Sequence, residues 1–469
     1  MLKVLKYIVI AWALLSIVTF PFYWPWLRMV WVFNPSIPKP KYETPINPTE
    51  ARLQDIDYLS TLTKYDRAFN EEATAAFAEK VEEMREAAAD MSEAEFYLAV
   101  AEAVALADNG HSNVSYRPQY TQFNTIGARL YAFDNEVYIV SAAPDKADAL
   151  GARVLAVNGL PIKTLRTELG QFKGGNQTWR ELYGLFLIES PELLEAAGYS
   201  SSFERIELTL EAATGDIRQV PFEGLDLDED ADVASRSAWQ SLVPNEGSPG
   251  FADWPHVLGD GEGRLLDYLT DTSEPKTYSL TNNGLYIRAL PGFRAGDQSI
   301  KNAYKSILSE HPDGSLDYMV VDFRLHDGGD YTKSMSFAKA APRAVKDDGK
   351  IYIITGPNTF SAAIVTVAML KYYSGDRAMI VGEQMGDREQ FWAERGTSFR
   401  LPNSGYYINY ATGYHDWENG CKGEEYCYTM NEMYEVPAGS LKPEISLPQD
   451  FSSYLAGEDV VLNWISDQH

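Results

Sequence analysis

Cysteine, histidine and basic side chains are scarce in this chain of 469 residues. It contains two cysteines and six histidines, too few for a disulfide-rich scaffold, a four-thiolate zinc site or a histidine-rich metal centre. It also lacks a GxxxxGK[ST] run, which excludes a P-loop nucleotide-binding enzyme. We therefore expect an activity that uses no metal and no cofactor.

Acidic side chains dominate the charge. There are 67 acidic and 40 basic residues, a formal net charge of −27. Such a surface repels phosphate backbones, so nucleic acid is not an expected partner, and broad docking onto anionic lipid is disfavoured. The hydrophobic content of 45% is that of an ordinary globular protein, and the length suggests about three domains.

The N-terminus carries the one long apolar run. Lys3 and Lys6 precede an uncharged stretch over residues 7–27, about the length of a helix that crosses a bilayer. Aromatic residues near its end are typical of a membrane interface, and no small-x-small cleavage site follows. Residues 1–33 are therefore predicted to be a signal anchor, with the remainder periplasmic or at the cell surface. A cleaved signal peptide and a secreted protein is the alternative.

Two further features concern the same compartment. Residues 34–50 contain five prolines, which predicts a stiff, extended spacer that holds the globular part off the membrane. Cys421 and Cys427 close the short run CKGEEYC, and outside the cytoplasm we expect them to form a disulfide.

The first half of the globular part combines helices with a β-rich region. Residues 51–120 are rich in good helix formers and are predicted to be helical. Residues 121–225 contain short β-type runs separated by turn signals such as Asn158-Gly159. We expect a small, partly open barrel of short strands with about one helix.

The second half predicts an α/β domain. Residues 226–275 are acidic and rich in Gly, Pro and Trp, and are predicted to be a connector or lid. In residues 276–469, continuous apolar strands alternate with helices. This pattern is typical of a mainly parallel sheet packed between helices.

Three local signals point to serine chemistry. Ser361 begins an apolar helix directly after a strand, where the helix dipole and the N–H of Ala362 would stabilise an oxyanion. The N–H of Gly329, or of Gly328, would be the second donor, and His111, at a helix-to-strand turn, would be the base. Each residue also has a structural interpretation: a helix N-cap, a tight turn or a core histidine.

Taken together, these segments resemble the S41 peptidases, the C-terminal processing and tricorn-type serine proteases. A D-x-R-x-x-x-G-G pattern precedes a T-x-S-A-A helix start, at Asp322, Arg324, Gly328, Gly329, Thr359, Ser361, Ala362 and Ala363. The strand end VGE and the run D-x-G-H-S, at 381–383 and 108–112, also match. The resemblance implies a crotonase-like α/β catalytic core and a PDZ-like domain at 121–225, which lacks a GLGF-type carboxylate-binding loop.

The family has two chemistries, and the residues favour one of them. Processing proteases use a lysine just after VGE, but here Asp387 or Arg388 stands in that place. Lys371 cannot substitute, because it lies ten residues along the same helix as Ser361, about 15 Å away. The resemblance therefore implies the Ser–His branch, with His111. That branch places a serine directly before the histidine, where this chain has Gly110.

The sequence alone does not decide which carboxylate supports His111. Asp416 and Glu418 lie together on an aromatic-flanked loop, and Glu435 lies nearer the family's usual acid. His415 is expected to pack against Trp417 rather than to contact substrate. A metal site built from this loop is disfavoured, because no HExxH or paired-histidine spacing is present.

The sequence thus predicts a membrane-anchored, extracytoplasmic serine peptidase with no cofactor. Its expected catalytic residues are Ser361, His111 and either Asp416 or Glu418, with Gly329 and Ala362 forming the oxyanion hole. Its expected substrates are peptides or unfolded protein chains. Two alternatives stay open: a catalytically inactive peptide-binding module on the same fold, and a serine esterase. The oligomeric state is not indicated.

Overall fold

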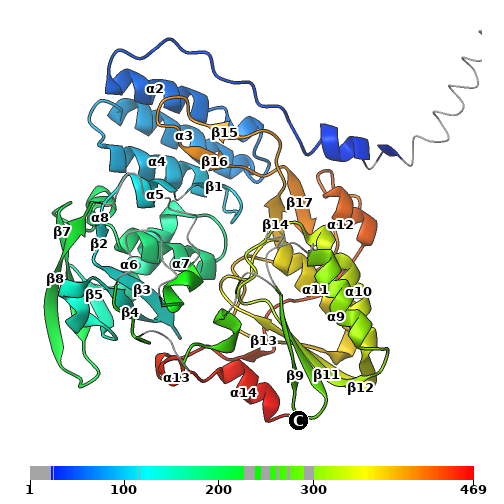
Figure 1. Cartoon of the computed structure of the whole chain (residues 1–469). Helices are drawn as coiled ribbons and strands as arrows, with labels where there is room; N and C mark the ends of the chain where they lie inside the picture. Colours follow the sequence, from blue (N-terminus) through cyan, green and yellow to red (C-terminus); the bar gives the residue numbers. More distant parts are fainter. Residues whose placement is uncertain are drawn as a thin grey trace, which may run out of the picture.

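The computed structural model describes residues 23–24, 26–115, 117–226, 238–244, 254–259, 264–270, 272, 275–289 and 300–469. Three parts are visible in Figure 1: a layer of helices at the top, a β domain on the left, and an α/β part at the lower right.

The N-terminal layer consists of helices α2 (Pro48–Leu59), α3 (Glu71–Ala87) and α4 (Glu93–Ala105), with a 3-10 turn η1 (Leu62–Lys64) after α2. Each helix begins after a residue whose side chain accepts a hydrogen bond from the first turn, namely Asn47, Asn70 and Ser92. Ser92 and Glu95 form a capping box that opens α4. The helices predicted for this segment are confirmed.

A small sheet joins this layer to a distant part of the chain. After α4 the chain turns through His111 into β1 (Asn113–Val114), which pairs antiparallel with β16 (Tyr407–Asn409). Strand β15 (Phe399–Arg400) completes the sheet, and helix α5 (Arg117–Thr121) leads on to the β domain. The turn that carries His111 therefore lies between α4 and a strand that pairs with β16, a distant part of the chain.

The β domain is an antiparallel sheet in the order β2-β8-β7-β5-β4-β3, with β6 added beside β5. Its strands are β2 (Thr125–Ile126), β3 (Ala128–Phe133), β4 (Glu136–Ala142), β5 (Arg153–Val157), β6 (Leu160–Pro161), β7 (Arg205–Glu211) and β8 (Ile217–Leu225). It contains more helix than predicted: α6 (Ile162–Leu169), α7 (Gln177–Ile188), α8 (Pro191–Ala196) and the 3-10 turns η2 (Pro144–Ala149) and η3 (Gly170–Phe172). The expectation of about one helix was wrong, because residues 184–188 at the end of α7 are all buried and such a continuous apolar run hides the helical period.

The α/β part is built on a six-stranded sheet in the order β18-β13-β12-β11-β10-β9. All neighbouring pairs are parallel except β9 with β10, so the predicted mainly parallel sheet is confirmed. The strands are β9 (Lys276–Leu280), β10 (Gly284–Arg288), β11 (Leu316–Asp322), β12 (Val345–Thr355), β13 (Ala378–Gly382) and β18 (Ile445–Ser446).

Helices cover both faces of this sheet. One face packs against α9 (Ile300–Glu310), α10 (Met335–Ala344) and α11 (Ala362–Ser374), and the other against α14 (Val460–Ser466). Helix α13 (Phe451–Ala456) packs instead with Phe133 and Trp239, between the β domain and the connector that precedes β9. Short 3-10 turns η4 (Ala238–Leu242), η5 (Asp267–Leu269), η6 (Tyr331–Lys333) and η7 (Gly375–Arg377) complete the elements. Whether residues 226–275 act as a lid stays a prediction.

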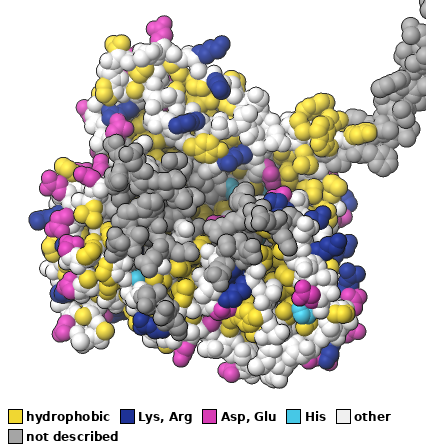
Figure 2. Space-filling model, in the orientation of Figure 1, with side chains coloured by type: hydrophobic (Ala, Val, Ile, Leu, Met, Phe, Trp, Pro, Cys, Tyr) yellow, Lys and Arg dark blue, Asp and Glu magenta, His cyan; other side chains and the backbone are white. Residues whose placement is uncertain are grey.

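The predicted anchor lies largely outside the described residues, which begin at Tyr23. Within the described part, no helix is both long and apolar enough to span a membrane. Residues 26–31 form a short helical segment where Trp26 and Trp31 are 62% and 70% exposed. Figure 2 shows a group of hydrophobic side chains at this place.

The predicted spacer is extended but does not stand away from the globular part. Phe33 is fully buried and Ile37 is 7% exposed. The N–H of Ile37 donates to Oγ1 of Thr397 at 2.8 Å, and the N–H of Thr397 donates to the carbonyl of Pro35 at 3.2 Å. The start of the segment is thus packed on the protein surface through Ile37, whereas Ile46 near its end is 88% exposed.

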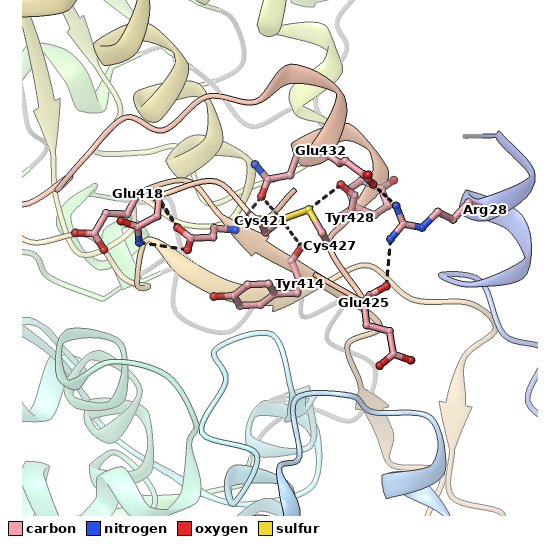
Figure 3. The surroundings of a disulfide bond; sticks show 11 residues. Arg28, Tyr414, Glu418, Cys421, Glu425, Cys427, Tyr428 and Glu432 are labelled. Atoms are coloured by element: carbon pink, nitrogen blue, oxygen red, sulfur yellow. Dashed lines mark hydrogen bonds and ion pairs between the residues drawn. A yellow bond between two sulfur atoms is a disulfide. The ribbon is translucent and has the colours of Figure 1, made fainter. Parts of the chain in front are cut away.

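The disulfide between Cys421 and Cys427 is present, as predicted (Figure 3). It closes the loop between β17 (Gly413–Asp416), which pairs with β14 (Gln390–Ala393), and helix α12 (Thr429–Tyr434). Arg28 reaches this loop: its guanidinium forms an ion pair with Glu432 and donates to the carbonyl of Glu425 at 3.1 Å. The loop therefore ties the short N-terminal helical segment to the α/β part.

Candidate active site

Ser361 lies in a strained turn between β12 and α11. Its backbone has φ 55° and ψ −117°, a conformation that costs a residue other than glycine roughly 1–3 kcal/mol. The side chain makes no capping hydrogen bond with α11, so the N-cap interpretation is not what holds it there. Thr359 organises the turn, because its hydroxyl accepts from the N–H of Gly356 and donates to the carbonyl of Phe323, both at 3.0 Å.

Gly328 and Gly329 lie beside this serine. Their φ angles are +134° and +114°, which glycine adopts without a Cβ clash. A Cβ on Gly328 would be 3.1 Å from the Cβ of Ser361 and 3.5 Å from its Oγ. The loop that follows β11 can therefore approach the serine this closely because it has glycine at position 328.

The N–H of Gly328 is already engaged. It donates to Nδ1 of His326 at 3.3 Å. Burial lowers the pKa of His326 to about 3, so this imidazole is neutral and can accept the bond. In the described part of the chain, the N–H groups of Gly329 and Ala362 have no hydrogen-bond acceptor. Of the two glycines, Gly329 is therefore the one that could serve as an oxyanion donor together with Ala362.

His111 lies against a buried carboxylate. Its Nδ1 is 3.3 Å from Oδ2 of Asp387, whose side chain is 2% exposed. The imidazole is also flanked by the rings of Phe360 and Phe391, at 4.5 and 5.2 Å between centroids. Its Nε2 atom is buried and has no hydrogen-bond partner among the residues described. Nδ1 of His111 and Oδ2 of Asp387 are likewise buried without a hydrogen bond among the described residues, so the acid lies in contact with the imidazole but is not hydrogen-bonded to it.

The acid that the structure places beside His111 is Asp387, whereas the predicted Asp416 and Glu418 contact other groups. Oδ1 of Asp416 accepts from the N–H groups of Glu418 and Asn419 at 3.0 and 2.8 Å, so this carboxylate folds its own loop. The carboxylate of Glu418 accepts from the side chain of Gln390 at 2.5 Å. The physical reason is the register of β17 with β14, which places Asp416 opposite Gln390.

The other acidic candidate also lies elsewhere. Glu435 is paired with Lys422 at 2.9 Å on the surface, and both side chains are more than half exposed. His415 is buried and stacks on Phe391 at 4.9 Å, and its ring lies 6.1 Å from that of Trp417. The expected packing of His415 against Trp417 is confirmed.

A glycine and an ion pair hold His111 and Asp387 together. A Cβ at Gly110 would be 2.8 Å from Oδ2 of Asp387, so a larger residue before the histidine would collide with the acid. This explains the departure from the serine that the tricorn-type pattern places there. Arg388 donates to the carboxylate of Asp108 at 2.9 and 3.0 Å, and Arg180 of α7 joins the same carboxylate. These bonds connect the turn that carries Asp108 and His111 to the turn that carries Asp387 and Arg388.

Lys371 is directed away from the site, toward the carbonyl of Ser440. The structure thus agrees with the exclusion of this lysine as the partner of Ser361. In the described ranges, no cluster of His, Cys, Asp and Glu is suited to hold a metal ion.

Ser361, His111, Gly328 and Gly329 line one cleft of about 480 Å³. Its opposite wall comes from the β domain, through Lys173, Trp179, Leu182, Tyr183 and Phe186. The ring of Trp179 stacks on that of Phe360, directly before Ser361, at 4.2 Å. This wall could not be predicted from sequence, because it depends on how α7 docks against the α/β part.

No family model and no curated protein matches the chain. Among solved structures, it is similar to mature CPAF, with a TM-score of 0.55 and 12% identity over 89% of this chain and 96% of that one. Mature CPAF complexed with lactacystin gives a TM-score of 0.54 and 13% identity over 90% and 97%. The match to the photosystem II D1 C-terminal processing protease covers 87% of this chain and 98% of that one at 12% identity. Its TM-score of 0.35 is too low to support a conclusion about the fold. At these identities the similarity to CPAF shows the fold alone, and the predicted α/β class is confirmed at this level.

Proposed function

We propose that this protein is a serine peptidase in which Ser361 is the nucleophile and His111 the general base. The main support for the proposal is that Ser361 and His111 line the same cleft. The serine lies on a strained strand-to-helix turn, and the histidine lies beside the buried carboxylate of Asp387. Asp387 orients the imidazole through Nδ1 and stabilises the imidazolium when it forms.

The reaction follows from these positions. Oγ of Ser361 attacks the scissile carbonyl carbon, and its proton passes to Nε2 of His111. The tetrahedral oxyanion is held by the N–H groups of Gly329 and Ala362. When the C–N bond breaks, His111 returns the proton to the leaving amine, and water then releases the acyl group by the same steps. In the described structure Oγ and Nε2 are not hydrogen-bonded, so substrate binding has to bring them together.

The fold supports a peptidase over other uses of the same residues. The chain shares the fold of CPAF along nearly the full length of both chains. The cleft is large enough for several residues of an extended peptide, and its β-domain wall is mostly aromatic and apolar. Peptides and unfolded protein segments are therefore the proposed substrates.

We place the globular part outside the cytoplasm. The disulfide between Cys421 and Cys427 is a structural bond of a kind that persists in oxidising compartments. The uncharged N-terminal sequence is the proposed membrane anchor, and the exposed Trp26 and Trp31 would lie near its interface.

The test is labelling of the full chain with a fluorophosphonate probe. We expect the wild type to be labelled and Ser361→Ala not to be labelled. Labelling of His111→Ala should be strongly reduced. Ser404→Ala, a change in a surface turn, is the control that keeps full labelling. A folded wild type that does not react at any pH between 6 and 9 would refute the mechanism and favour the inactive binding module. Comparing a p-nitrophenyl ester with peptide anilides then separates an esterase from a peptidase.

A further inference from the structure

Lys173 is a buried cation on the β-domain wall of the cleft. It follows η3, three residues before the N-cap of α7, and is 8% exposed. Its Nζ lies 4.1 Å from the ring centroid of Tyr183 and 5.6 Å from that of Trp179. Among the residues that the structure describes, no group forms an ion pair or hydrogen bond with Nζ.

The other charged side chains that line the cleft all have partners. Glu394 is paired with His415 at 3.6 Å, Arg395 bonds the side chain of Asn409, and Asp327 has a partner as well. His111 has Asp387. Among the described residues of the lining, Lys173 is thus the charged residue that contacts only aromatic rings and has no ion-pair or hydrogen-bond partner, although buried cations are normally paired.

The surroundings of Lys173 favour an anion from outside. Burial lowers the pKa of Lys173 to about 7, and the negative charge of Asp387 acts in the opposite direction without pairing with it. The apolar side chains of Leu182 and Phe186 line the same wall. An anionic group that entered the cleft would meet the ammonium in a site of low polarity, where their attraction is strong.

We propose that Lys173 binds a carboxylate of the substrate, while the side chain next to that carboxylate packs on the wall formed by Trp179, Leu182 and Phe186. The carboxylate is either the C-terminus of a peptide or the side chain of an Asp or Glu residue. The proposal rests on the peptidase function, because it names the substrate class of the same cleft.

The direct test needs no hydrolysis. Binding of 3-phenylpropionate and of 3-phenylpropionamide to the full chain is measured by calorimetry at pH 6. We expect the acid to bind at least tenfold more tightly than the amide. Lys173→Met should abolish this preference and leave binding of the amide unchanged. Lys163→Met, on the 64% exposed lysine of α6, is the matched control and should keep the preference.

Matched peptides identify the source of the carboxylate. One pair differs only in a free or amidated C-terminus, and another only in Glu or Gln at one position, and kcat/KM is compared within each pair. The pair that shows the acid preference names the source. The preference should decline between pH 6 and pH 8 as Lys173 loses its proton. Asp387, Tyr183 and His111 also face this region and act on a carboxylate as well, so the same ratio is measured in Lys173→Met, where the part due to Lys173 should be missing.

Several outcomes would overturn the proposal. These are equal binding of acid and amide by the wild type, or an acid preference that persists in Lys173→Met. Loss of fluorophosphonate labelling in a folded Lys173→Met would also do so, since it would assign the lysine to proton transfer. An acid preference in a wild type that is not labelled would leave the subsite standing and refute only the peptidase mechanism.

Discussion

His111 and Asp387 lie far apart in the sequence, but Nδ1 of the histidine is 3.3 Å from Oδ2 of the aspartate. The carboxylate is almost completely buried. The contact depends on the absence of a side chain at Gly110, which leaves room for the acid. It also depends on the ion pair between Asp108 and Arg388, which joins the two turns. The imidazole therefore lies against a buried carboxylate, with neither ring nitrogen hydrogen-bonded to a described residue.

Asp387→Asn should lower the rate constant of fluorophosphonate labelling by about 10³–10⁴-fold, because the amide cannot stabilise the imidazolium and favours the wrong tautomer. Asp416→Asn is the matched control. It leaves an oxygen acceptor for the N–H groups of its own loop and should change the rate less than about threefold. An equal or larger loss in Asp416→Asn would reinstate the acid first expected from the sequence.

Gly328→Ala should abolish labelling while the protein still folds. The new Cβ would lie 3.1 Å from that of Ser361, and its φ of +134° is unfavourable for alanine. A displacement of the serine by about 1 Å is enough for a loss of about 100-fold. Gly423→Ala carries a similar backbone penalty at φ +95° with no atom near the new Cβ. Undiminished labelling of Gly328→Ala would argue against close approach of the β11 loop during the reaction.

His326 predicts a dependence of stability on pH. Its pKa is lowered from 6.5 to about 3 by burial, so below pH 6.5 the unfolded chain binds a proton that the folded chain does not. The contribution is present above pH 6.5 and is lost as the pH falls toward 3. From pH 7 to pH 5 the free energy of unfolding should fall by about 2 kcal/mol on account of this residue.

The measurement is urea unfolding of the wild type and of His326→Asn at both pH values. The asparagine oxygen can accept the N–H of Gly328 but does not titrate in this range. The variant should therefore lose about 2 kcal/mol less than the wild type between the two pH values. Parallel pH dependence of the two proteins would show that the pKa of His326 in the folded state is close to its value in the unfolded chain.

Removal of the disulfide should affect stability and not chemistry. The bond joins residues six positions apart, and closing so short a loop stabilises the folded state by about 2 kcal/mol. The double variant Cys421→Ala/Cys427→Ala should lose that amount in urea unfolding and keep the labelling rate of the wild type. A reducing agent should have the same effect on the wild type and none on the variant. A large drop in labelling would mean that the loop shapes the active site.

The candidate nucleophile could be predicted from sequence because its setting is contiguous. A strand, a turn and an apolar helix follow each other around Ser361, and each has its own local pattern. The same holds for the buried strand that ends before Gly328 and Gly329. Short-range periodicity and turn residues are enough to predict such elements.

The partner of His111 could not be chosen in this way. Asp387 was visible only as the residue standing where a processing protease has lysine, and the acidic loop at Asp416 and Glu418 offered more carboxylates. Which acid reaches the imidazole depends on the register between β14 and β17 and on the turn after β13. These are long-range pairings, and no local pattern encodes them.

By itself, the sequence determined the α/β class, the helical N-terminal layer, the disulfide and the serine turn, because each depends on residues close together in the chain. Only the tertiary structure decided that Asp387 lies beside His111, that Gly329 rather than Gly328 has an N–H without an acceptor among the described residues, and that Lys173 and the aromatic residues of α7 form the opposite wall of the cleft. The physical reason is that these contacts arise when separately folded segments bury their apolar faces against one another, and side chains at the resulting junction then meet partners from other parts of the chain.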